Sequence, residues 1–189
     1  MLLSCRALGN TKEIRLAQVN VVIKQWYDDH PGTHRMPPIK MNNTVLNGWW
    51  ELHGPTVKAA ATRAAAPVFS YLAGRYFPTD DPLHVALRGV PAGLADFYDT
   101  LYSEPMFMGR EALERFAAVT VGFGEHYQAL RQLCLGRNIF AFQVTPKVHK
   151  LQHFPMLAEI VNPRFCQVYA EESQIGTTTR CWKRSMAGR

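Results

Sequence analysis

The segment from residue 110 to 135 constrains the fold most, because its apolar residues recur at helical spacing. They stand three, four or six to seven residues apart, at Leu113, Phe116, Ala117, Val121, Tyr127, Leu130 and Leu133. This spacing places apolar side chains on one face of a helix. We therefore predict a long helix from Arg110 to Leu135, with Gly136 as its C-terminal cap. Gly122 and Gly124 weaken its middle and allow close packing or a bend.

Similar patterns predict further helices earlier in the chain. Their approximate bounds are Lys12–Asp28, Pro55–Tyr76, Leu83–Arg88 and Pro91–Leu101. Thr11 precedes the first helix and can accept a hydrogen bond from one of its free amides. Pro67 is expected to kink or divide the second helix, because proline lacks an amide proton and clashes with the preceding turn. The span from Gly32 to Gly54 is rich in Pro, Asn and Gly and predicts a long loop carrying Trp49 and Trp50.

The remaining segments complete a mostly helical prediction. Ile139–Val144 is a short apolar run that suits either a strand or buried coil, and Arg164–Tyr169 suits a short strand or an extended link. Helices are predicted from Thr145-Pro146 to about Pro155 and from Glu171 to Met186, with a break at Asn162-Pro163. We expect residues 1–189 to form a single helical domain of about seven helices with little or no sheet.

Length and composition place the chain among globular proteins. It has 189 residues, of which 47% are hydrophobic and 19% charged, enough for one domain with a sizeable core. No apolar run approaches the roughly 18–20 residues that span a bilayer, and the first residues do not make a secretory signal. We expect no membrane partner and a nuclear or cytoplasmic location. The four cysteines form no CxxC pair, so free thiols are expected.

Positive charge gathers at the far end of the chain. Residues 1–136 carry 13 Lys/Arg and 12 Asp/Glu, whereas residues 137–189 carry 8 and 3. This basic C-terminal subregion, residues 137–189, indicates an anionic partner, and nucleic acid is the commonest one. A solvated basic surface is the alternative. The candidate phosphate-contacting residues are Lys147, Lys150, Arg180, Lys183 and Arg184.

Two histidines one helical turn apart are the strongest metal-binding pattern. On a helix His149 and His153 share a face, as a pair of metal ligands would. A metalloprotease would need glutamate directly after the first histidine, where this chain has Lys150. The competing interpretation is structural, with one histidine packed inward and the other in solvent.

Glu171 and Glu172 are adjacent, so on a helix their side chains diverge by about 100° and do not form a coupled acid–base pair. Their position at a predicted helix start suits the positive end of the helix dipole. Glu172 could instead supply one carboxylate of a two-metal site for phosphoryl transfer, with Mg²⁺ or Mn²⁺ as cofactor. No nucleotide-binding glycine motif and no GxSxG motif is present, and a pairing of Cys134 with His149 or His153 stays open.

A longer pattern lies within residues 145–186. It consists of Pro146-Lys147-x-His149-x-Leu151-x-His153-Phe154-Pro155, a spacer of about 16 residues, and Glu172-Ser173. This pattern resembles the C-terminal tail of CACTA-type transposon-encoded proteins. It implies an RNase H-like protein in which Glu172 is the last metal-binding acid and His149 and His153 lie on the preceding helix. The chain departs from the pattern at Val148, where histidine is common, and no aspartate-bearing strands precede its helices. It would then be the helical back half of a larger protein.

A second resemblance concerns Trp49-Trp50-Glu51-Leu52-x-Gly54 and the residues after it, which are similar to repetitive, uncharacterised open reading frames of protist genomes. Together these observations predict a transposon-derived helical fragment that contacts nucleic acid, without independent catalysis and without a cofactor. One alternative is a Mg²⁺- or Mn²⁺-dependent nuclease or transposase component that uses Glu172. The other is a protein-interaction module with Trp49 and Trp50 as its main contact. The substrate, the choice between DNA and RNA, and the oligomeric state stay open.

Overall fold

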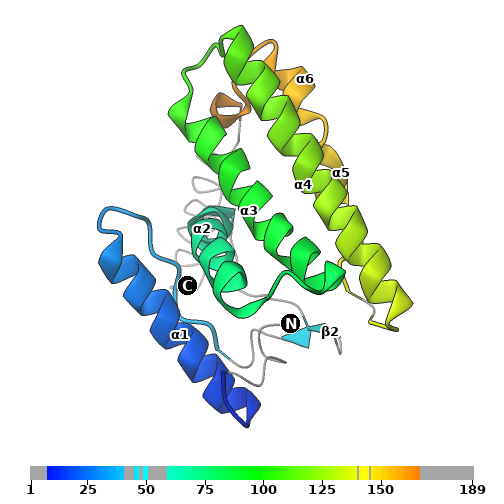
Figure 1. The fold of residues 1–189 in the computed structure, drawn as a ribbon. Coiled ribbons are helices and arrows are strands. Elements are labelled where there is room, and N and C mark those ends of the chain that lie inside the picture. The colour runs from blue at the N-terminus through cyan, green and yellow to red at the C-terminus, as the bar shows by residue number, and fades with distance from the viewer. Residues whose placement is uncertain are drawn as a thin grey trace, which may run out of the picture.

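The computed structural model describes residues 8–40, 45–46, 49–50, 59–139, 141–144 and 146–166 (Figure 1). The α-helices in this part of the chain are α1 (Lys12–Asp29), α2 (Ala59–Tyr76), α3 (Pro82–Ser103), α4 (Arg110–Gly136), α5 (Pro146–Leu151) and α6 (Phe154–Ala158). A 3-10 helix, η5, spans Pro163–Phe165. Two antiparallel strands of two residues each, β1 (Val45–Leu46) and β2 (Trp49–Trp50), are the only sheet in the described part. The prediction of a mostly helical fold with little sheet is confirmed, but the described residues form fewer α-helices than the seven that were expected.

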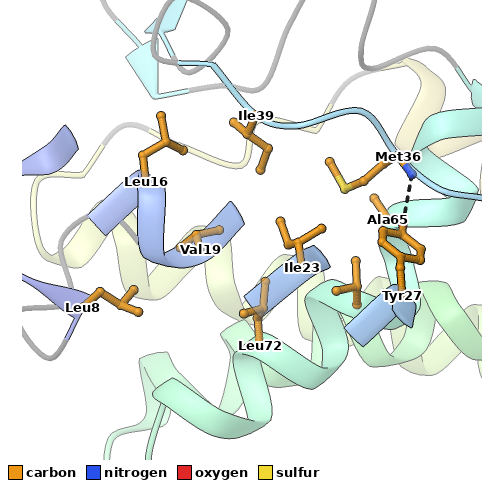
Figure 2. Close-up of a cluster of buried hydrophobic side chains, with 10 residues drawn as sticks. Leu8, Leu16, Val19, Ile23, Tyr27, Met36, Ile39, Ala65 and Leu72 are labelled. Atoms are coloured by element: carbon orange, nitrogen blue, oxygen red, sulfur yellow. Dashed lines mark hydrogen bonds between the residues drawn. The ribbon is translucent and has the colours of Figure 1, made fainter. Parts of the chain in front are cut away.

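Helix α1 begins where the sequence predicts. The hydroxyl oxygen of Thr11 accepts a hydrogen bond from the amide of Ile14 at 3.3 Å, which satisfies one of the free amides of the first turn. One face of the helix buries Leu16, Val19, Ile23 and Tyr27 (Figure 2). These side chains meet Leu72 and Ala65 of α2, together with Met36 and Ile39 from the segment between the helices.

Two polar side chains of α1 hold that connecting segment in place. The Tyr27 hydroxyl donates to the carbonyl of Ala64 at 2.7 Å and accepts from the amide of Met36 at 3.2 Å. Asn20 donates to the carbonyl of Ile39 at 2.8 Å and accepts from the Ile39 amide at 2.9 Å. The first part of the predicted long loop is therefore fixed against the core.

Proline interrupts neither α2 nor α3. Pro67 lies inside the single helix α2, so the helix is not divided there, and the two short helices predicted on either side of Pro91 are one continuous α3. A proline inside a helix removes one hydrogen bond and costs about 3 kcal/mol. Helix α3 buries Leu83, Ala86 and Leu87 before Pro91, and Phe97 and Leu101 after it. Each such side chain contributes about 1.5–3 kcal/mol, so packing on both sides outweighs the break.

Helices α3 and α4 form a long hairpin that Figure 1 shows side by side. Phe97 and Phe116 meet across it with ring centroids 5.1 Å apart, next to buried Leu101 and Ala158. A methyl group at Gly93 would lie 3.2 Å from both Cα and Cβ of Phe123, so the helices approach closely there. Of the two glycines predicted to permit close packing in α4, Gly124 approaches the side chain of Gln152, whereas Gly122 faces open space.

The end of α4 differs from the prediction in one residue. Gly136 is the last helical residue and not the cap, and Asn138 adopts the left-handed conformation with φ of 55°. Asparagine tolerates this conformation better than most residues. The turn brings Arg137 onto Asp81 at the start of α3, with nitrogen–oxygen distances of 2.7 and 3.0 Å. Asp81 also accepts from the Leu83 amide, so one carboxylate caps α3 and ties it to α4.

The chain then returns along α4 as α5, α6 and η5 (Figure 1). Residues 141–144 are coil and not strand, but Gln143 and Val144 are exposed, so this is not the buried coil that was predicted. The predicted helix to Pro155 is instead two short helices, with a turn at 152–153 before α6. Residues Pro163–Phe165 are a 3-10 helix and not the start of a strand or extended link. None of the helices in the described ranges combines the length and apolar character that crossing a bilayer requires.

Candidate functional site

Asn162 joins the end of α3 to η5. Its side chain is fully buried, and its amide nitrogen lies 3.0, 3.2 and 3.1 Å from the carbonyl oxygens of Leu101, Glu104 and Pro105. These groups include the free carbonyls that any helix leaves at its C-terminus. The Asn162 side-chain oxygen accepts from the Arg164 amide at 3.0 Å, which caps η5. One side chain therefore caps two elements some 60 residues apart in sequence.

This double cap brings together what we call the arginine–aromatic cluster: Arg63, Tyr102, Arg164 and Phe165. The Arg63 guanidinium carbon lies 4.1 Å from the centre of the Tyr102 ring. The Arg164 guanidinium carbon lies 5.3 Å from the same ring and 4.6 Å from the Phe165 ring. Arg164 also donates to the Tyr102 carbonyl at 2.6 Å. Cation and ring thus alternate along the cluster, at distances where a cation is attracted to an aromatic face.

The two arginines of the cluster keep their charge available. In the described part of the chain, neither Arg63 nor Arg164 has a carboxylate within 4.0 Å. Glu104, whose backbone lies beside Asn162, forms its ion pair with Arg115 instead. The guanidinium groups are therefore held by rings and a backbone carbonyl, which leaves their positive charge uncompensated by these groups.

Large apolar side chains stand exposed around the cluster. Phe165 is 47% exposed and Phe107, in the turn between α3 and α4, is 69% exposed. The amide of Asn162 donates to the carbonyl of Met106 at 2.8 Å, which ties this turn to the chain just before η5. Met156 of α6 and Ile160 after it are also more than half exposed. Phe165 and Phe107 therefore offer exposed rings for contact with a partner.

The structure describes only part of the predicted phosphate-contacting set. Lys150 lies exposed on α5. Lys147 belongs to the same helix, but its side chain lies outside the described atoms. Arg180, Lys183 and Arg184 lie outside the described residues, as do Glu171 and Glu172. Trp49 and Trp50 are described only as backbone of β2, so their predicted role as a contact stays a prediction.

The two predicted metal ligands do lie together. His149 and His153 are both exposed, and their Nε2 atoms are 3.2 Å apart, with the ring planes nearly perpendicular. The structural interpretation, with one ring packed inward, does not describe this pair. Within the described ranges, no group of three His, Cys, Asp or Glu side chains could surround a metal ion.

A cysteine–histidine nucleophile receives no support from the position of Cys134. Its side chain is fully buried among Leu87, Leu130 and other core residues. Burial raises the pKa of the Cys134 thiol and keeps it protonated. Cys134 and Cys166, the two cysteines in the described part, are free thiols, in agreement with the prediction.

Sequence reasoning missed the arginine–aromatic cluster. Its members come from α2, the end of α3 and η5, so no local pattern unites them. The sequence contained one indication of η5. Asn162-Pro163 was predicted only as a helix break, but asparagine followed by proline is also typical of a helix start. No protein-family model, curated protein or solved structure matches this chain.

Proposed function

We propose that this chain is a transposon-derived helical fragment that contacts nucleic acid, without independent catalysis. The resemblance of residues 145–186 to CACTA-type proteins supports the origin, and the basic subregion 137–189 supports an anionic partner. The observation that carries the proposal is the arginine–aromatic cluster. It adds a positively charged, partly exposed ring surface within the described fold.

The cluster suits a single-stranded nucleic acid better than a duplex. Proteins that bind single strands combine cations for the backbone with aromatic rings on which bases stack. Arg63 and Arg164 supply the cations, and Phe165 and Phe107 supply the exposed rings. A rigid duplex keeps its bases stacked inside, where such rings do not reach them. Lys150 is an exposed cation on α5, earlier in the same returning segment.

Fluorescence anisotropy with a labelled single-stranded oligonucleotide tests the proposal. Arg63→Gln and Arg164→Gln should each weaken binding, and Phe165→Ala should cost about 1–3 kcal/mol of binding free energy, the usual worth of one stacked base. Arg110→Gln is the matched control, because Arg110 is an exposed arginine on α4 paired with Glu114. Unchanged affinity in all three cluster variants would exclude this surface as the binding site. DNA and RNA strands of equal length then decide the preferred nucleic acid.

A protein partner is the second candidate, and the exposure of Phe107, Met156 and Ile160 favours it. Aromatic residues, methionine and arginine are enriched at protein interfaces. The salt dependence of binding distinguishes a nucleic-acid partner from a protein partner. Nucleic-acid binding weakens steeply with salt because counterions are released, whereas an apolar protein contact changes little.

The nuclease alternative has its own test. If the chain is the back half of a larger RNase H-like protein, Glu172 would act only together with aspartates supplied elsewhere. Incubation of the chain with oligonucleotide and Mg²⁺ or Mn²⁺ should give no cleavage. Cleavage that disappears in Glu172→Gln would replace the present proposal with the nuclease.

A further inference from the structure

The exposed histidine pair on the returning segment has a geometry that neither packing nor the proposed nucleic-acid contact requires. His149 lies in α5, whereas His153 lies beyond its end and precedes α6. His153 nevertheless keeps helical backbone angles, with φ of −89° and ψ of −8°. The turn therefore preserves the spacing that puts both rings on one side, and their Nε2 atoms stand 3.2 Å apart.

The two Nε2 atoms are within hydrogen-bond distance of each other, and the same separation suits two imidazole ligands of a single metal ion. Zinc–nitrogen bonds of about 2.0–2.1 Å place two ligand nitrogens roughly 2.9 Å apart at a right angle and roughly 3.3 Å apart at a tetrahedral angle. The observed 3.2 Å falls between these limits. The nearly perpendicular rings, with an interplanar angle of 84° and centroids 4.8 Å apart, do not stack on each other. With both rings in the tautomer that leaves Nε2 unprotonated, the two Nε2 atoms can bind one ion.

We propose that His149 and His153 bind one divalent transition-metal ion, of the class of Zn²⁺, Ni²⁺ or Cu²⁺. Imidazole nitrogen suits these borderline ions, whereas Mg²⁺ and Ca²⁺ prefer oxygen ligands. Water fills the remaining coordination positions, since the described residues offer no third protein ligand. The site is thus an open one, unlike a closed four-ligand structural zinc site. Lys150, exposed on the same helix, adds positive charge nearby and weakens the affinity without removing a ligand.

The bound ion would also fix the local fold. Helix α5 has only six residues, and the turn at 152–153 separates it from α6. An ion held by His149 and His153 would link α5 to the residue that directly precedes α6. At Gly124 of α4 the side chain of Gln152 lies against the backbone, so this turn is already seated on the long helix.

Isothermal titration calorimetry with NiCl₂ and with ZnCl₂ tests the site on the full chain, after removal of any polyhistidine tag. We expect one ion to bind, with both rings as ligands. His149→Gln and His153→Gln should therefore each lower the affinity for the ion by at least about tenfold, because even the loss of a residue that only supports a metal ligand usually lowers affinity that much. His34→Gln is the matched control, because His34 is exposed in the non-helical segment after α1, and His30, four residues before it, stacks on Trp26 and bonds to the Trp26 carbonyl. It should leave the affinity unchanged.

Two results would overturn the proposal: no binding by the wild-type chain, or a loss below about tenfold in either histidine variant. Both rings are exposed, so the variants should fold, and far-UV circular dichroism checks this. The electron paramagnetic resonance spectrum of one equivalent of Cu²⁺ gives a second readout. It should show nitrogen coupling from two imidazoles in the wild type and from fewer in each variant.

Discussion

Removal of the Asn162 side chain should destabilise the protein far more than its size suggests. Asn162→Ala leaves the carbonyls of Leu101, Glu104 and Pro105 without their common donor and leaves the Arg164 amide without its cap. A buried polar group without a partner costs about 1–3 kcal/mol, and a lost helix cap about 0.5–2 kcal/mol. Two amide protons serve three acceptors, so these costs do not simply add. We expect a loss of about 2–4 kcal/mol, a large share of the 5–15 kcal/mol typical of domains.

Asn162→Asp shows whether the Asn162 side chain stabilises the fold through the hydrogen bonds it donates or through the volume it fills. Aspartate nearly matches asparagine in size and keeps the oxygen that accepts from the Arg164 amide, but it places a buried carboxylate against three carbonyl oxygens. If donation holds the site together, Asp should be at least as destabilising as Ala. If only packing matters, Asp should be nearly harmless.

Urea unfolding provides the measurement, with the midpoint shifting and the slope unchanged. Asn20→Ala is the matched control, because Asn20 clasps Ile39 through two hydrogen bonds at the other end of the molecule. It should lower stability but leave oligonucleotide binding intact, whereas Asn162→Ala should lower both, since it releases Arg164 and Phe165. A loss below about 0.5 kcal/mol for Asn162→Ala and Asn162→Asp would refute this reasoning.

Two further predictions concern the α3–α4 hairpin. Gly93→Ala adds a methyl group 3.2 Å from the Phe123 backbone, and overpacking of about 1–3 kcal/mol should outweigh the roughly 0.5–1 kcal/mol that alanine gains over glycine inside a helix. Gly122→Ala faces open space inside α4 and should stabilise by about 0.5–1 kcal/mol, so urea unfolding of the two variants should shift in opposite directions. The pKa of Asp81 is lowered mainly by its hydrogen bonds from Arg137 and then by the one from the Leu83 amide. The stability that Asp81 contributes is therefore present above its usual pKa near 3.8, and it is lost as the pH falls through the lowered pKa of the folded state. Thermal melting of Asp81→Asn should accordingly show a deficit at pH 7 that closes in strong acid, and a deficit that stays constant with pH would contradict the assignment.

The sequence predicted those parts of the fold that local pattern decides. The helix from Lys12 and its Thr11 cap, and the long helix from Arg110, depend on residues within one or two turns of each other. Apolar spacing and a capping side chain carry that information directly. The helical class followed from the same evidence.

Where distant packing decides, sequence reasoning was wrong or silent. The sequence predicts a break between Arg88 and Pro91, but the core on both sides of Pro91 keeps α3 continuous. The sequence predicts Gly136 as the C-terminal cap of α4, but the residue that adopts the left-handed conformation after the helix is Asn138. The sequence predicts only a helix break at Asn162. No residue near it in sequence indicates the three carbonyl groups that its side chain contacts at the end of α3.

The candidate site divides in the same way. The histidine pair was visible from its spacing, because both residues lie within one turn of chain. The arginine–aromatic cluster was not, because Arg63, Tyr102 and Arg164 become neighbours only when α2, α3 and η5 pack. Charge counting located the excess of cations in residues 137–189 but could not show that Arg63, from the charge-balanced part of the chain, joins them.

The salt dependence of oligonucleotide binding tests the central claim most directly. The equilibrium constant should be measured from about 50 to 200 mM salt for the wild type, for Arg63→Gln/Arg164→Gln and for the control Arg110→Gln. If the cluster arginines contact the phosphates of a single strand, the double variant should bind more weakly and its log–log slope should be shallower by about 1.4, roughly 0.7 for each lost contact, with the control unchanged. Binding that does not depend on salt, or equal slopes for the wild type and the double variant, would contradict the account.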